Sequence, residues 1–108
     1  MNLDVIIVLT TLPNQEQASS MAVALVKESL AACVQVLPAM QSFYIWQGEL
    51  QQDEEFLLLI KSRKECYPAL QERICQLHPY EIPEILATSV SDGLPAYLDW
   101  LQKATRSP

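Results

Sequence analysis

The chain has 108 residues, half of them hydrophobic, and a formal net charge of −6. This composition is typical of one folded domain, and the negative charge excludes the basic surface that nucleic-acid binding requires. No apolar run approaches the ~20 residues of a membrane helix, and two glycines are too few for a Gly-rich phosphate loop. Three cysteines with no CxxC spacing, and a start without Lys or Arg, predict a cytoplasmic protein with reduced thiols.

The first half of the chain predicts a strand, a helix and an interrupted second strand. The continuous apolar run at 5–9 is typical of a strand that is buried on both faces. Asn14 is a plausible N-cap for a helix of about 16 residues, in which small and apolar residues recur at helical spacing. Residues 31–37 and 42–46 predict the second strand. We expect a bulge or bend at Pro38, because proline cannot donate a ladder hydrogen bond.

The second half predicts two further strands and two helices. An acidic stretch at 49–55, read as a solvated hairpin end, leads into an apolar strand at 56–60. A helix follows, with Pro68 in its first turn, and residues 85–90 form the last strand. The apolar face of this helix comprises Tyr67, Leu70, Ile74 and Leu77. A short terminal helix then carries Tyr97, Trp100, Leu101 and Ala104.

The order β-α-β-β-α-β plus a terminal helix predicts an α+β domain over 1–108 with the ferredoxin-like split βαβ plan and a long hairpin between its second and third strands. This plan places both crossover helices on one face of an antiparallel sheet, and the other face should alternate towards polar residues. The strands at 5–9 and 56–60 are instead apolar at every central position. A single chain would therefore expose an apolar patch, which we expect another subunit to cover.

Three segments carry a specific resemblance when they occur in this order. They are LAACVQVLP at 30–38, SFYIWQGEL at 42–50 and LHPYEIPEI at 77–85. With them the chain resembles the CutA divalent-cation tolerance family over nearly its whole length and, in architecture alone, the PII-type trimeric signalling proteins. The resemblance implies a homotrimer with its sheets facing inward, and an association with tolerance of divalent metals, copper in particular.

His78, the only histidine, is the sharpest metal candidate because imidazole suits copper, nickel and zinc. The resemblance implies a copper site at positions that correspond here to Thr10, Leu77 and His78, of which only His78 matches the Cys and His of those relatives. Cys75 lies three residues earlier on the predicted helix and is a weaker candidate. The alternative reading is structural: His78 caps the helix by meeting free carbonyls, and Cys33, Cys66 and Cys75 are packing residues.

The prolines around 78–85 predict a semi-rigid extended arm between helix and strand. Carboxylates on such an arm are expected to make contacts between subunits, and the hairpin aromatics are expected at an interface. The residues expected at an inter-subunit cleft or interface are Tyr44, Trp46, Tyr80, Glu81 and Glu84.

These observations predict a trimeric, non-enzymatic divalent-cation tolerance protein that requires no cofactor and binds copper or another divalent metal weakly. An enzyme is least supported, because no motif supplies a nucleophile together with its base. A PII-like regulator is the alternative, with Tyr80, Glu81 and residues 61–64 around a small anionic ligand in the inter-subunit clefts. A trimeric scaffold for an unidentified protein partner is a third reading.

Overall fold

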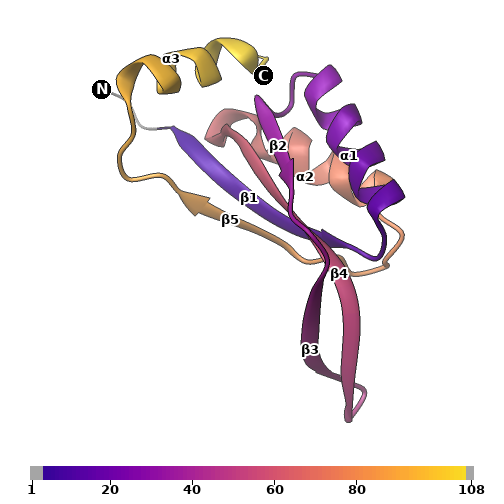
Figure 1. Ribbon diagram of the computed structural model, residues 1–108. Coiled ribbons are helices and arrows are strands. Elements are labelled where there is room, and N and C mark those ends of the chain that lie inside the picture. Colours follow the sequence, from indigo (N-terminus) through magenta and orange to yellow (C-terminus); the bar gives the residue numbers. More distant parts are fainter. Residues whose placement is uncertain (1–3, 107–108) are drawn as a thin grey trace.

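The structure is a computed structural model that describes residues 4–106 (Figure 1). Its strands and helices confirm the predicted α+β class. In chain order the elements are β1 (Val5–Leu12), α1 (Gln15–Lys27), β2 (Cys33–Val36), β3 (Met40–Trp46), β4 (Glu49–Arg63), the short 3₁₀ helix η1 (Lys64–Cys66), α2 (Tyr67–Leu77), β5 (Ile85–Ser89) and α3 (Pro95–Ala104). Among these described residues, no helix is long and apolar enough to cross a membrane.

The strands form an antiparallel sheet in the order β2-β4-β1-β5, and β3 pairs with the first half of β4. Helices α1 and α2 cover one face, while α3 lies across one end of the sheet (Figure 1). Successive strand residues point to opposite faces. Ile6 and Val8 therefore pack in the main core under α1 and α2, whereas Val5 packs with α3 on the other side.

Helix α1 begins where the sequence predicts and ends earlier. The Asn14 side chain accepts a hydrogen bond of 2.8 Å from the Gln17 main-chain N–H, which is the geometry of an N-cap. The helix has 13 residues, because the chain turns at Ser29 with a φ of 58° and the Leu30 N–H closes back onto the Leu25 carbonyl at 3.0 Å.

The predicted bulge at Pro38 is visible in the strand register. Val36 lies opposite Leu58, and Met40 lies opposite Glu55. Three residues on one strand thus face two on the other, which is the signature of a bulge. The irregular residues 37–39 also divide the predicted second strand into β2 and β3, so the strand ends at Val36 and resumes at Met40.

Strand β4 is longer than expected and includes the acidic stretch. It runs for 15 residues, and its first half pairs only with β3 to form a two-stranded arm that projects from the body (Figure 1). The arm turns at Gln47 and Gly48, whose φ angles of 51° and 81° suit the twist of a tight hairpin.

The main core lies between the sheet and helices α1 and α2. Helix α2 buries Leu70 and Ile74, as predicted, whereas Leu77 is exposed. The buried residues of this core are Ile6, Val8, Leu12, Ala18, Met21, Leu25, Leu30, Ala31, Leu58, Ile60, Leu70 and Ile74. A second small core under α3 comprises Val5, Leu98 and Leu101; α3 therefore packs through Leu98 and Leu101 and leaves Tyr97 and Trp100 exposed.

On the sheet face opposite α1 and α2, residues 4–106 provide no covering layer beyond α3, and this face carries apolar side chains. We call this surface the open face and define it by Ile7, Leu9, Leu57, Leu59 and Leu86. The register places Leu9 beside both Leu59 and Leu86. Four of the five are only partly buried, and Leu86 is exposed. The expected apolar patch is therefore present on the single chain.

Candidate functional site

His78 ends α2 and ties the following loop to β1. Its main-chain N–H donates to the Ile74 carbonyl at 2.8 Å, and its extended backbone follows from the next residue, Pro79. The imidazole is 8% exposed. The Tyr80 N–H donates to Nδ1 at 3.1 Å, so Nδ1 is unprotonated and Nε2–H donates to the Thr11 carbonyl at 2.6 Å. The ring thus meets a carbonyl of β1, where the structural reading predicted a carbonyl of the helix.

The three positions that the resemblance implies for copper do not provide a copper donor set within one chain. Thr10 is buried, and its hydroxyl has no hydrogen-bond partner among the described residues. Leu77 has no donor atom, and both ring nitrogens of His78 are engaged by main-chain groups. Cys75 is exposed, whereas His78 is buried. Within residues 4–106 no three His, Cys, Asp or Glu side chains gather around one point.

Tyr80 joins the same loop to the base of the arm. Its ring lies 4.9 Å from that of His78, and its hydroxyl donates to Oε2 of Glu55 at 3.3 Å. Glu55 is only 8% exposed. Partial burial, followed by the charge of Glu55, raises the pKa of the Tyr80 phenol above its usual value. The Tyr80 phenol therefore keeps its proton more readily, and the hydrogen bond that it donates to Glu55 joins the loop to the arm.

Tyr44 and Asp53 make a second phenol–carboxylate pair, on the arm itself. They come from neighbouring strands, since Asp53 lies opposite Ser42, two residues from Tyr44. The Tyr44 hydroxyl donates to the Asp53 carboxylate. This hydrogen bond, with smaller effects of burial and of the Asp53 and Glu55 charges, raises the pKa of Tyr44 to about 12. We call Tyr44, Asp53, Glu55 and Tyr80 the phenol–carboxylate cluster.

The structure brings together some of the predicted interface residues. Tyr44 and Tyr80 both belong to this cluster, each through a hydrogen bond to its own carboxylate, whereas Trp46 lies at the exposed tip of the arm. Glu81 and Glu84 are exposed on the loop. The sequence reading placed Glu55 among solvated acids, and this was wrong, because Tyr80 folds over it. The contribution of Thr11 was also missed, since a main-chain carbonyl leaves no signal in side-chain patterns.

A shallow pocket of about 250 Å³ lies beside the start of α2 and the edge strand β5. Its lining includes one cation, Lys64, and three residues with side-chain hydroxyls, Tyr67, Thr88 and Ser89. The remaining lining residues are Ile6 and Ala87. Tyr80 and Glu81, which the sequence grouped with residues 61–64 around a ligand, do not line it.

The antiparallel sheet, its two covering helices and the projecting arm also occur together in solved structures of other proteins. The structure of a divalent cation tolerance protein (CutA1) from Thermus thermophilus superposes with a TM-score of 0.93 at 47% identity, over 94% of this chain and 99% of that one. The CutA1 structure from Oryza sativa gives 0.93 at 40% identity, over 94% of each chain. The fold is that of CutA1 proteins.

The chain belongs to the CutA1 divalent ion tolerance protein family, whose model matches residues 6–104. The divalent-cation tolerance protein CutA of Thermus thermophilus is 48% identical over 99 residues, which are 92% of this chain and 96% of that protein. The chloroplastic protein CutA of Arabidopsis thaliana is 40% identical over 94% of this chain. The chain spans 56% of that plant protein. These matches confirm the resemblance stated from the sequence.

Proposed function

We propose that the chain is a homotrimeric divalent-cation tolerance protein whose subunits follow the ferredoxin-like plan. The observation that carries this proposal is the open face, a row of apolar side chains on the uncovered side of the sheet in a chain of the CutA1 family. Apolar surface of this extent is rarely left in water by a soluble monomer. Copies of the chain that meet through their open faces remove it from water.

The mass of the assembly tests this proposal directly. Light scattering after size exclusion should give three times the 12.2 kDa of one chain at micromolar concentration. Leu59→Glu places a carboxylate on the open face and should lower that mass, because an unpaired charge is costly to bury. Glu54→Gln, an exposed change on the arm, is the control. A wild-type chain that runs as a monomer contradicts the trimer.

We propose that the protein contributes to metal tolerance either indirectly or by binding a divalent metal ion weakly. Thr10, Leu77 and His78 supply one imidazole among them, and its two nitrogens bond Thr11 and Tyr80. Useful affinity for copper or zinc requires three or four ligands. A tight site would therefore need donors that are brought together from more than one subunit.

Metal titration of the reduced protein tests this point. Calorimetry with copper(I), copper(II) and zinc should give the same weak binding for the wild type and for His78→Asn, while the variant loses thermal stability. Cys75→Ser, an exposed change, is the control for thiol binding. A submicromolar site that disappears in His78→Asn would make His78 a metal ligand and overturn the indirect reading.

We propose that the protein is not an enzyme: no motif supplies a nucleophile together with its base, and the one histidine bonds two main-chain groups. Of the two alternative functions, the sensor of a small anion is the one that an observation favours, namely the pocket beside Lys64. A thermal-shift screen with nucleotides and carboxylic acids, run on the wild type and on Lys64→Gln, tests it. A shift that the variant loses supports this reading, and no shift with any compound contradicts it.

A further inference from the structure

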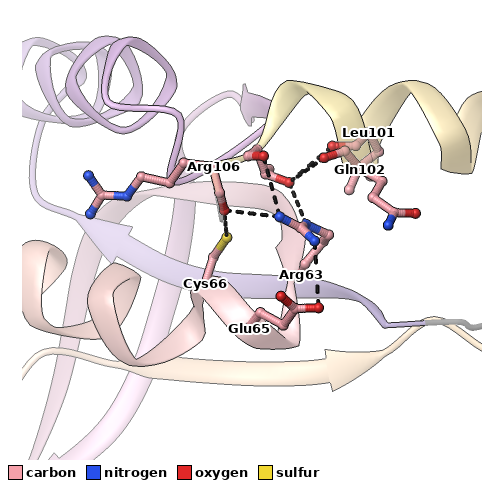
Figure 2. Close-up of polar contacts among 7 residues, drawn as sticks. Arg63, Glu65, Cys66, Leu101, Gln102 and Arg106 are labelled. Carbon is pink, nitrogen blue, oxygen red and sulfur yellow. Dashed lines mark hydrogen bonds and ion pairs between the residues drawn. The ribbon is translucent and has the colours of Figure 1, made fainter. Parts of the chain in front are cut away.

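The end of the described chain is fastened to the body by a buried arginine (Figure 2). Arg63, the last residue of β4, is 6% exposed. Its Nε donates to the Thr105 hydroxyl at 2.6 Å, and its Nη2 donates to the carbonyls of Thr105 and Arg106 at 3.3 and 2.9 Å. Nη1 lies 3.6 Å from Glu65. We call Arg63, Thr105 and Arg106 the latch.

Two further contacts close the latch on neighbouring elements. The Cys66 thiol donates to the Arg106 carbonyl at 3.1 Å, as Figure 2 shows. The Arg106 N–H donates to the Ser29 carbonyl at 2.8 Å, just beyond α1. The segment that follows α3 is therefore joined to β4, η1 and the end of α1 at one point.

The apolar contact of α3 with the body is small. It comprises the buried Val5, Leu98 and Leu101, with Ala32 and Val90 packed against them. At its start, Leu94 occupies the N-cap position and gives no side-chain cap. The planar fork of Arg63, which binds several oxygens in fixed directions, is thus the most directional attachment of this helix.

The outer side of α3 presents two aromatic rings next to the open face. Tyr97 and Trp100 are 40% and 48% exposed, and their centroids lie 5.5 Å apart. Lys61 stands opposite Ile7 on the same sheet face, and its Nζ lies 5.7 Å from the centre of the Tyr97 ring. An ammonium group on an apolar surface is costly to bury without a partner, and an aromatic face is one such partner.

We propose that the latch holds α3 in the position that self-association requires, with Tyr97 placed over Lys61 and its ring continuous with the open face. Arg63 is a positioning residue in this account, and the partner surface is a second copy of the chain. The inference rests on the proposed trimer. Without the latch, α3 moves away from the sheet, Lys61 loses its aromatic partner and the apolar surface carries an uncovered charge.

Arg63→Lys tests the latch, because lysine keeps the charge and loses the fork. We expect the trimer of this variant to dissociate at a chain concentration at least about tenfold higher than that of the wild type. The reason is that several directional bonds to a buried cation are lost. Arg73→Lys is the matched control: Arg73 pairs with Glu28 between α1 and α2, and its side chain makes none of the latch contacts. Its dissociation should stay within about twofold of the wild type, as expected for a partly exposed pair.

Hydrogen exchange of the α3 amides separates loosening of the helix from dissociation itself. Tyr97→Leu should weaken assembly while it leaves the latch intact, so it provides the exchange rate of α3 in a dissociated chain. When the two variants are compared at the same fraction of trimer, the α3 amides of Arg63→Lys should exchange faster than those of Tyr97→Leu. If Arg63→Lys does not fold, Thr105→Val, which removes the Nε acceptor, takes its place under the same criteria.

Two results overturn the inference and leave the trimer standing: a latch variant that assembles as tightly as the wild type, or one that dissociates while α3 exchanges no faster than in Tyr97→Leu. A wild-type chain that is monomeric by light scattering contradicts the proposed trimer, and it therefore overturns the inference as well. The two failures are therefore distinguishable.

Discussion

The phenol of Tyr80 closes over the carboxylate of Glu55, 25 residues earlier in the chain, at 3.3 Å. This contact joins the loop after α2 to the base of the arm, where nothing in the local sequence of either segment indicates the other. Glu55 is nearly buried, and Tyr80 is the one side-chain donor that reaches it among the contacts of residues 4–106. A substitution of this pair should therefore loosen the loop after α2 from the base of the arm.

Tyr80→Phe should lower the free energy of unfolding by about 1 kcal/mol, because the buried Glu55 carboxylate loses a hydrogen-bond donor. Urea unfolding at a fixed chain concentration measures this. Tyr67→Phe is the control: its hydroxyl donates to Gln71 at 2.8 Å in an exposed pair, which water replaces. Equal effects of the two substitutions would show that the Glu55 contact adds nothing specific.

Thr10→Val should raise the free energy of unfolding by about 1 kcal/mol, because it removes a buried hydroxyl that has no partner among the described residues and keeps the side-chain shape. Thermal unfolding of the two proteins at the same concentration checks the sign. Thr10→Ser, which keeps the hydroxyl and loses a methyl group, should be destabilising. A destabilised valine variant would mean that the hydroxyl has a buried partner, such as a water molecule, that compensates for its burial.

The stability of the arm should depend on pH in the alkaline range. Tyr44 has its pKa raised from 10.0 to about 12 in the folded chain. The folded state therefore holds the phenol proton more tightly, so its stabilising effect is complete below pH 10 and is lost as the pH rises towards 12. The ultraviolet absorbance of tyrosinate follows the loss of the phenol proton in this range.

Two variants isolate this titration. Asp53→Asn removes the carboxylate that accepts the hydrogen bond of Tyr44, and it should move the Tyr44 transition back towards the usual tyrosine range. Tyr44→Phe should remove the same transition from the absorbance curve altogether. An unchanged curve in both variants would assign the late transition to another tyrosine.

Asn14→Ala should cost about 1 kcal/mol, because the Gln17 N–H loses its capping acceptor at the start of α1. Asn14→Asp keeps an acceptor at the same place and should be nearly neutral. Chemical unfolding followed by circular dichroism measures both. A neutral alanine variant would show that packing of Ala18, Met21 and Leu25 alone sets the start of the helix.

Much of the fold follows from patterns that act over a few residues. The cap at Asn14, the bulge around Pro38 and the buried faces of α1 and α2 depend on local backbone chemistry and on hydrophobic spacing, so they can be read before any contact is known. The apolar open face was predicted for the same reason. The order of three motifs along the chain also identified the family, which the comparisons confirm.

The partners of the polar side chains depend on contacts between distant segments. His78 bonds the carbonyl of Thr11, 67 residues away. Arg63 bonds the chain beyond α3 across 42 and 43 residues, and Glu55 meets Tyr80 across 25. Strand register and helix docking set these distances, and the amino-acid pattern around each residue does not record them.

The sequence by itself therefore determined the elements, the apolar surface and the family, because each rests on local spacing or on an ordered set of motifs. Only the tertiary structure decided that the imidazole of His78 is occupied by main-chain groups and that Glu55 is buried. It also decided that Arg63 fastens α3. The physical reason is that a polar group takes its role from the partner that folding brings within hydrogen-bond distance.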